Sequence, residues 1–186
     1  MSLRIQIVRV AAFCALFAAA VGSSSAQVRN SAAQPIALNA VLNDSVSVNL
    51  SANAVNFTLT PGSANNAGST AITATTTWLL RPNIGSVSTY AFFSSSASAL
   101  TDGAGDNIPS ADFLISDNGG AFKALTNTVP FGGANAGLRL SSTFILGKNK
   151  KGSHSDVMTF NINLTSIPNL PAKTYTGILT IQAQAF

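Results

Sequence analysis

The last thirteen residues, 174–186 (TYTGILTIQAQAF), alternate between apolar and polar side chains. Their apolar side comprises Tyr175, Leu179, Ile181 and Ala183. This period of two predicts a half-buried β-strand. A strand of a lipid-spanning barrel needs one continuously apolar face. Here the final aromatic, Phe186, falls on the same side as Gln182 and Gln184. One Trp and two Tyr are also too few to form aromatic girdles, so the pattern favours a water-exposed sandwich without integral membrane insertion.

Alternation of the same kind continues through most of the chain. The segments that show it are 36–42, 46–50, 55–59, 71–80, 88–93, 112–116, 121–125, 138–146 and 158–164. Turns rich in Gly, Asn, Asp and Pro separate them. We therefore predict an all-β protein, an immunoglobulin-like antiparallel β-sandwich of roughly nine or ten strands. Its predicted core comprises Val48, Phe57, Trp78, Phe92, Phe144, Phe160, Ile162, Leu179 and Ile181.

The first 26 residues have the three parts of a secretory signal peptide. Arg4 and Arg9 precede the apolar run VAAFCALFAAAV, and the small residues GSSSA follow it. The run is shorter than the ~20 residues that a transmembrane helix needs. We expect cleavage after Ala26, a single domain over residues 27–186, and a secreted protein of the periplasm or cell surface. Cys14 would be lost with the signal peptide, so the mature chain would contain no disulfide.

Composition argues against several classes of function. Charged residues make up 9% of the chain, and without Arg4 and Arg9 eight basic residues face six Asp. So small a positive surplus does not predict nucleic-acid binding. The chain contains no Glu and one His. His154 lies in GSHSD, a stretch that we interpret as a solvated hairpin tip rather than as a catalytic triad. We expect no enzyme activity and no cofactor.

Two further groups of residues offer weak binding chemistry. Asp102, Asp106, Asp112 and Asp117 form a short acidic stretch with Gly-rich turns, which makes them candidate calcium ligands. The complete calcium-loop spacing and its closing Glu are absent, so a polar turn is the favoured interpretation. Trp78 and Tyr90 could form a sugar-stacking platform, but the alternation around Trp78 favours a place in the core.

Both ends of the expected domain resemble a known group of proteins. PIALNAVLNDSVSVNL (35–50) and LPAKTYTGILTIQAQ (170–184) are similar to segments of small exported bacterial β-sandwich proteins of the pilin and spore-coat-protein-U type. Pro171, Tyr175 and Gly177 match the turn and Tyr-x-Gly that introduce the last strand in those families. The resemblance implies an exported subunit that assembles by giving an N-terminal strand to a neighbouring copy. It implies no catalytic residue.

The candidate assembly strand is the first alternating segment, with Ile36, Leu38, Ala40 and Leu42 on one face. It could pair with the last strand of its own chain, which is the default for an isolated domain, or with a second copy. The leading hypothesis is a structural or adhesive subunit that associates with itself or with other exported subunits. The alternative is a secreted carbohydrate- or protein-binding module that uses loops within residues 94–137.

Overall fold

The computed structural model describes residues 31–147 and 150–186. The predicted signal peptide, residues 1–26, and its cleavage point lie outside the described residues. The chain divides into two compact units, residues 1–40 and 41–186. The described part of the first unit, residues 31–40, has no helix or strand and its side chains are exposed. Across the described residues, no helix is long and apolar enough to cross a membrane.

The regular secondary structure of the second unit consists almost entirely of β-strands, which confirms the predicted all-β class. The strands are β1 (Ser45–Leu50), β2 (Asn66–Ala67), β3 (Ile72–Leu79), β4 (Ser86–Phe92), β5 (Leu100–Thr101), β6 (Asn107–Ile108), β7 (Phe113–Asp117), β8 (Lys123–Ala124), β9 (Gly137–Phe144), β10 (Lys151–Ile162) and β11 (Thr180–Ala185). A single 3₁₀ turn, η1 (Ser110–Asp112), precedes β7. Four of these strands are only two residues long, and such short pieces are not visible as alternation in a sequence.

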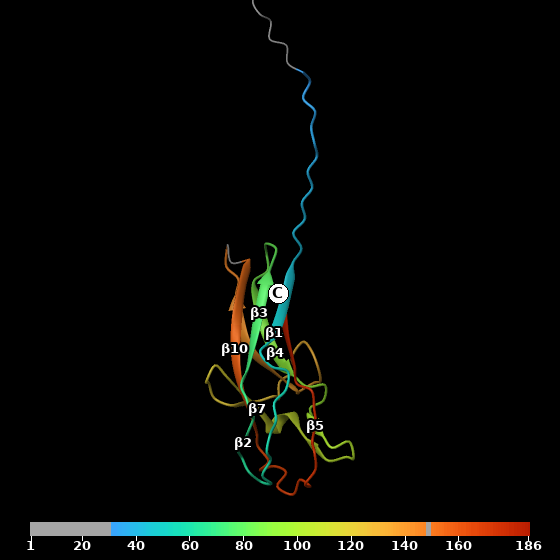
Figure 1. Cartoon of the computed structure of the whole chain (residues 1–186), viewed down its shortest axis with the longest axis vertical. Helices are drawn as coiled ribbons and strands as arrows, with labels where there is room; N and C mark the ends of the chain where they lie inside the picture. Colours follow the sequence, from blue (N-terminus) through green and yellow to red (C-terminus); the bar gives the residue numbers. More distant parts are fainter. Residues whose placement is uncertain (1–30, 148–149) are drawn as a thin grey trace, which may run out of the picture. The chain divides into compact units, whose positions relative to one another are not determined.

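The strands form two main antiparallel sheets. The larger has the order β1-β3-β10-β7-β8, with β2 also paired to β10, and the smaller has the order β11-β4-β9. β5 and β6 form a separate two-stranded hairpin. Figure 1 shows β1, β3 and β10 side by side. β1 and β11 are therefore edge strands of different sheets.

The expected strand over residues 36–42 is absent from the structure. The first strand begins at Ser45, and the last strand, β11, pairs with β4 rather than with the N-terminal segment. The β1–β3 ladder ends at the pair Ser45–Leu79. Directly beyond it, the Asp44 side chain accepts a hydrogen bond from the backbone N–H of Arg81 (2.8 Å) and forms an ion pair with its guanidinium. Since β3 has ended there, the residues before Asp44 have no continuing strand to pair with.

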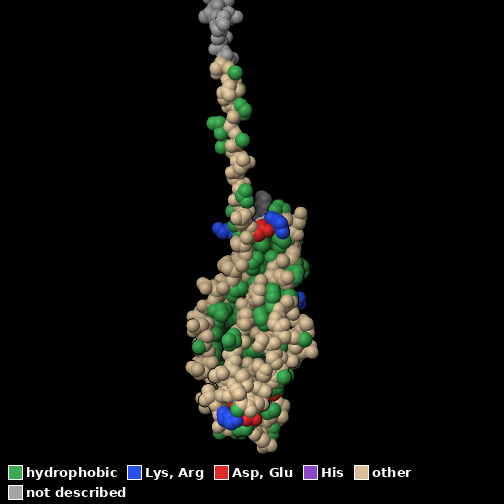
Figure 2. All heavy atoms as spheres, turned by 90° about the vertical axis from the view of Figure 1, so that its right-hand side faces the viewer, with side chains coloured by type: hydrophobic (Ala, Val, Ile, Leu, Met, Phe, Trp, Pro, Cys, Tyr) green, Lys and Arg blue, Asp and Glu red, His purple; other side chains and the backbone are tan. Residues whose placement is uncertain are grey.

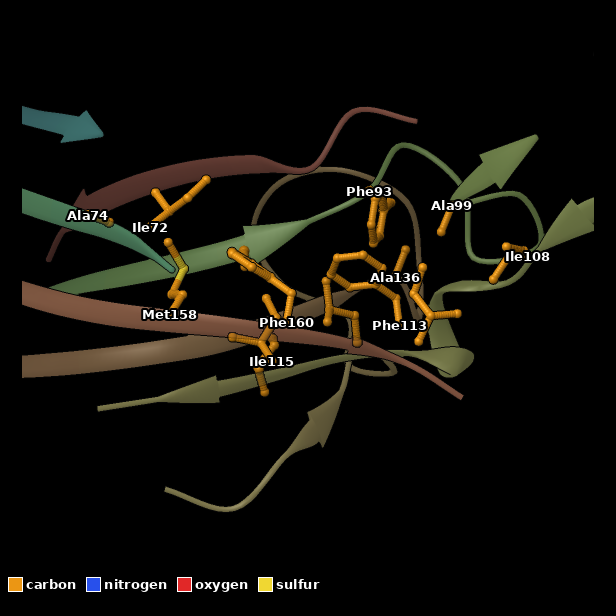
Figure 3. Packing of buried hydrophobic residues seen from close by; sticks show 14 of the residues in the cluster. Ile72, Ala74, Phe93, Ala99, Ile108, Phe113, Ile115, Ala136, Met158 and Phe160 are labelled. Atoms are coloured by element: carbon orange, nitrogen blue, oxygen red, sulfur yellow. The ribbon is translucent and has the colours of Figure 1, made fainter. Parts of the chain in front are cut away.

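The main core takes side chains from both sheets, such as Ile72 of the larger sheet and Ala91 of the smaller one. Figure 3 shows part of this core, with Ile72 and Met158 near each other. Trp78, Phe92, Phe160 and Ile162 are buried as predicted. Four other predicted core residues are half-buried against the main cluster, namely Val48, Phe57, Leu179 and Ile181. Phe92 lies outside that cluster and contacts Phe131, with a distance of 5.8 Å between ring centroids. The alternation of apolar and polar residues therefore predicts most of the core correctly.

Phe144 is the exception, because its side chain is 75% exposed. In the β4–β9 ladder Thr89 is opposite Ser141 and Tyr90 is opposite Arg139, so Leu140 is an extra residue in β9. Such a β-bulge puts two successive residues opposite one and reverses the alternation beyond it. Leu138 faces the core before the bulge, and Ile145, 4% exposed, faces it afterwards. The prediction that Phe144 belongs to the core was therefore wrong.

A polar layer separates the main cluster from a second one made by Trp78, Leu80, Val87 and Ile145. On β3, Thr76 lies between Ala74 and Trp78 along the inward-facing side. On β4, Thr89 lies between Val87 and Ala91 in the same way. The two hydroxyls are buried and form a 2.9 Å hydrogen bond between the two sheets.

The bulge leads to a prediction about stability. Ile145→Ala should lower the free energy of unfolding by about 2–5 kcal/mol, because it removes a buried side chain and leaves a cavity. Phe144→Ala should change it by less than about 0.5 kcal/mol, because the ring is largely in water. Urea denaturation of both variants measures the difference. A larger loss for Phe144→Ala would mean that β9 has no bulge in solution.

The buried hydroxyl pair leads to a second prediction. Thr76→Val alone leaves the Thr89 hydroxyl buried without its partner, which should cost about 1–3 kcal/mol of unfolding free energy. Replacing both threonines with valine removes both polar groups, so the double variant should lose less than the sum of the two single variants. A double-mutant cycle from denaturant unfolding tests this coupling. Strict additivity of the three values would contradict it.

Candidate functional site

The domain contains an apolar groove of about 1000 Å³. Its two walls come from residues 50–57, which follow β1, and from residues 170–181, which lead into β11. Its floor consists of core side chains, among them Ile72, Phe93, Phe113, Met158, Phe160 and Ile162. Figure 2 shows hydrophobic side chains gathered in a long band on one face of the domain. The floor side chains are themselves buried, whereas half-buried side chains of the walls, such as Val55, Phe57 and Leu179, line the sides of the groove.

In the described residues, the backbone hydrogen bonds of each wall join it to neighbouring segments and not to the opposite wall. In the first wall, the Asn56 carbonyl accepts a hydrogen bond from Ser69 N–H (2.8 Å), and Phe57 forms a β-bridge with Gly68. In the second wall, Thr176 exchanges two backbone hydrogen bonds of 2.9 Å with Thr101 of β5. Within the described part of the chain, no backbone hydrogen bond joins residues 51–59 to residues 170–179. The two walls thus flank a gap where a further strand could pair.

Aromatic rings form the centre of the groove floor. The Phe113 ring is in edge-to-face contact with Phe93 (5.1 Å between centroids) and Phe57 (5.8 Å), and it lies 6.0 Å from the Phe160 ring. Edge-to-face pairs add stabilisation beyond their buried area. Figure 3 shows Phe93, Phe113 and Phe160 approaching one another from different strands and the loop after β4. This packing gives the groove a rigid base.

The second wall contains the residues that carry the family resemblance, and the structure gives two of them a physical role. The Tyr175 hydroxyl donates a hydrogen bond to the Pro171 carbonyl (2.9 Å) and thereby closes the turn before the wall. At Gly177, a Cβ atom would lie only 2.0 Å from the carbonyl oxygen of Ala99. Only glycine permits this close approach between the wall and the segment that leads into β5.

The four candidate calcium ligands are not brought together. Asp102 and Asp106 both accept hydrogen bonds from the Lys173 ammonium, at 2.6 Å and 2.8 Å. Asp112 accepts one from the Ser166 hydroxyl, and Asp117 ends β7. Among residues 31–147 and 150–186, no group of three or more His, Cys, Asp or Glu could hold a metal ion. Sequence reasoning missed the ammonium of Lys173, because it comes from about 70 residues further along the chain.

Lys173 changes the electrostatics of its partners. Its hydrogen bond, followed by the backbone N–H groups of Ala104 and Asp106, lowers the pKa of Asp102 to about 2. The same two carboxylates raise the pKa of Lys173, first through the hydrogen bond to Asp102. The Lys173 ammonium and the Asp102 carboxylate therefore both stay charged at neutral pH.

The sequence pattern predicted a hairpin tip at His154, and this prediction was wrong. His154 lies within β10, directly opposite Thr76 of β3. Its Nε2 is 3.1 Å from Oδ1 of Asp156, and the hydroxyl of Ser141 donates a 2.9 Å hydrogen bond to Oδ2 of the same carboxylate. Asp156 is fully buried and lies between the serine and the histidine, whereas a catalytic triad needs the histidine in the middle.

The proposed sugar platform is also absent. Trp78 and Tyr90 are both buried, and the Tyr90 ring contacts Phe131 at 6.1 Å. Phe131 comes from the long loop between β8 and β9 and packs onto the side of β4 that carries Tyr90 and Phe92. Part of the 94–137 region therefore covers a sheet face rather than forming open ligand loops.

The candidate assembly residues are exposed. The exposed fractions are 84% for Ile36, 88% for Leu38 and 78% for Leu42, and Ala40 is exposed as well. Val41, which the alternation did not include, is 85% exposed. Segments this apolar are seldom left in water without a partner.

The Lys173 cluster leads to a prediction about pH. The Asp102 pKa is about 2 in the folded protein, below its ordinary 3.8. Its stabilising contribution is therefore complete above about pH 4 and is lost as the pH falls through 2. Carboxyl carbon NMR should give an Asp102 midpoint near 2 in the wild-type protein, and Lys173→Met should raise it towards the ordinary value. A wild-type midpoint near 4 would contradict the ion pair.

Comparison of the chain with family models, curated proteins and solved structures finds no match.

Proposed function

We propose that this protein is an exported, non-enzymatic structural or adhesive subunit whose groove receives residues 36–42 of a second copy. The observation that carries this proposal is the groove itself, whose half-buried apolar side chains lie along two walls that no backbone hydrogen bond joins in the described residues. An extended peptide can add to such edges by main-chain hydrogen bonds, while alternate side chains enter the pocket. The same chain contains an exposed segment with the required alternation.

The chemistry of donor and groove is complementary. Ile36, Leu38 and Leu42 would face the apolar and aromatic floor. Burial of each such side chain is worth about 1.5–3 kcal/mol relative to exposure. Three of them would therefore supply roughly 5–9 kcal/mol before the costs of association are subtracted. Main-chain pairing with both walls would add to this and fix the register.

Chain length prevents the whole 36–42 segment from entering the groove of its own chain. The steps from Leu42 to Ser45 cover at most ~11 Å of fully extended chain. The groove begins at Leu50, the far end of β1, and the strand from Ser45 to Leu50 is itself about 17 Å long. Leu42 therefore cannot reach its own groove while β1 remains paired with β3. A neighbouring copy has no such restriction.

This proposal also gives a more specific description of the fold. We infer that the two main sheets form an immunoglobulin-like sandwich from which one strand is missing at the groove. The donated segment would complete it and cover the core. The signal-peptide pattern in residues 1–26 supports export to the periplasm or cell surface, and the low content of charged residues suits a surface that packs against other subunits.

Paired variants test this function. Leu38→Asp places a charge on the face that would enter the groove, and Asn39→Asp places the same charge on the opposite face. The protein is expressed as the full chain and purified after export. Electron microscopy and size-exclusion chromatography should show ordered oligomers or fibres for the wild type and for Asn39→Asp. Leu38→Asp should be monomeric, because a buried unpaired carboxylate opposes insertion.

A deletion provides an independent comparison. Removal of residues 27–43 should abolish assembly, and a synthetic peptide of residues 34–43 should bind the shortened chain. The proposal is wrong if the shortened chain is folded, still assembles and does not bind the peptide. A wild-type protein that stays monomeric and binds a glycan would instead favour the secreted binding module.

A further inference from the structure

The groove wall at residues 173–177 is fastened to the β5–β6 hairpin by three separate contacts. Thr176 pairs with Thr101 through two backbone hydrogen bonds. Gly177 lies against the Ala99 carbonyl so closely that no Cβ would fit. Lys173 donates to both Asp102 and Asp106. The hairpin therefore holds the wall along its outer side.

The carboxylate at the centre of this contact is preorganised. Oδ1 of Asp102 accepts hydrogen bonds from the backbone N–H groups of Ala104 (2.8 Å) and Asp106 (3.0 Å). Oδ2 is left for Lys173, and the Asp102 side chain is only 2% exposed. A carboxylate that has lost most of its water depends on a cation and on hydrogen bonds. Lys173 supplies the cation, and its side chain also lines the groove.

The direction of the backbone explains how this contact can affect the groove. Because Thr176 directs its N–H and C=O towards Thr101, the backbone groups of Tyr175 and Gly177 point to the other side of the extended segment. In the described residues, these groups have no backbone partner. They are the groups that an incoming strand would pair with, so their position depends on how firmly Thr176 is held.

We propose that Lys173, Asp102 and Asp106 form a latch that holds the 173–177 wall where Tyr175 and Gly177 can pair with an inserted strand. This inference rests on the proposed function and deepens it, since it makes strand capture depend on an ion pair outside the apolar contacts. Lys173 is a positioning residue, and it acts through the wall. Opening of the latch frees the wall to move, so part of the binding energy is spent on ordering it.

Binding of a labelled peptide of residues 34–43 to the Leu38→Asp full chain, whose groove is free, tests the latch. Adding Lys173→Met should weaken the affinity by about tenfold or more, whereas Lys173→Arg, which can donate to both carboxylates, should restore it to within about threefold. Lys151→Met is the matched control, because Lys151 is exposed on β10 and does not line the groove. Peptide affinity that is equal in the Lys173→Met and Lys151→Met chains overturns the latch.

Amide hydrogen exchange distinguishes this inference from the proposed function. In Lys173→Met the Thr176 amide should exchange faster, while the Met158 amide in β10 should be unchanged, since the effect is local. If the Leu38→Asp chain with Lys173 intact binds no peptide, the proposed function fails. If the Thr176 amide exchanges at an unchanged rate in Lys173→Met, the latch is overturned. If Lys173→Met does not fold, Asp106→Asn takes its place in both measurements, because it removes one carboxylate of the latch and leaves the buried Asp102 paired.

Discussion

Apolar surface that the domain does not cover is the constraint on which the rest of the structure depends. The two main sheets bury a common core, yet at one edge the wall after β1 and the wall before β11 leave a groove lined by half-buried apolar side chains. Contact between water and a groove of this size is unfavourable, and exposed apolar patches commonly mark binding sites. Both walls are fixed from outside, by residues 68 and 69 on one side and by β5 on the other, so the groove cannot simply collapse. Under the proposed function, a partner strand would cover the apolar groove and pair with backbone groups of both walls.

The region between the two apolar clusters is stabilised by buried polar groups. Between the two apolar clusters lie the Thr76–Thr89 hydrogen bond and the buried carboxylate of Asp156 with its serine and histidine partners. Polar groups of this kind contribute little net stability, but an unpaired one costs a great deal, so they favour one alignment of the sheets over others. This layer links β3, β4, β9 and β10, and its position is independent of the groove. His154 and Asp156 lie in a stretch that could suggest a catalytic triad in the sequence. The central position of Asp156 between Ser141 and His154 instead gives them a structural role.

The charged group of Lys173 forms ion pairs with those of Asp102 and Asp106. The acidic stretch that suggested a calcium site contains two carboxylates whose cation is the ammonium of Lys173. The hairpin and the wall are thereby connected, and the same wall contains Tyr175 and Gly177. The resemblance to exported pilin-like subunits pointed to these positions. Their roles here follow from a turn-closing hydrogen bond and a close backbone approach.

The sequence by itself determined the all-β class, most of the strands and most of the core, because alternation with period two records which side of each strand is buried. It also singled out residues 36–42 as apolar, but not their conformation, since an isolated alternating segment does not define its partner. Only the tertiary structure decided the rest. The bulge at Leu140 reversed the faces of Phe144 and Ile145, because register depends on the neighbouring strand. The groove and the pairing of Lys173 with Asp102 join segments far apart in the chain, and no local pattern encodes such distances.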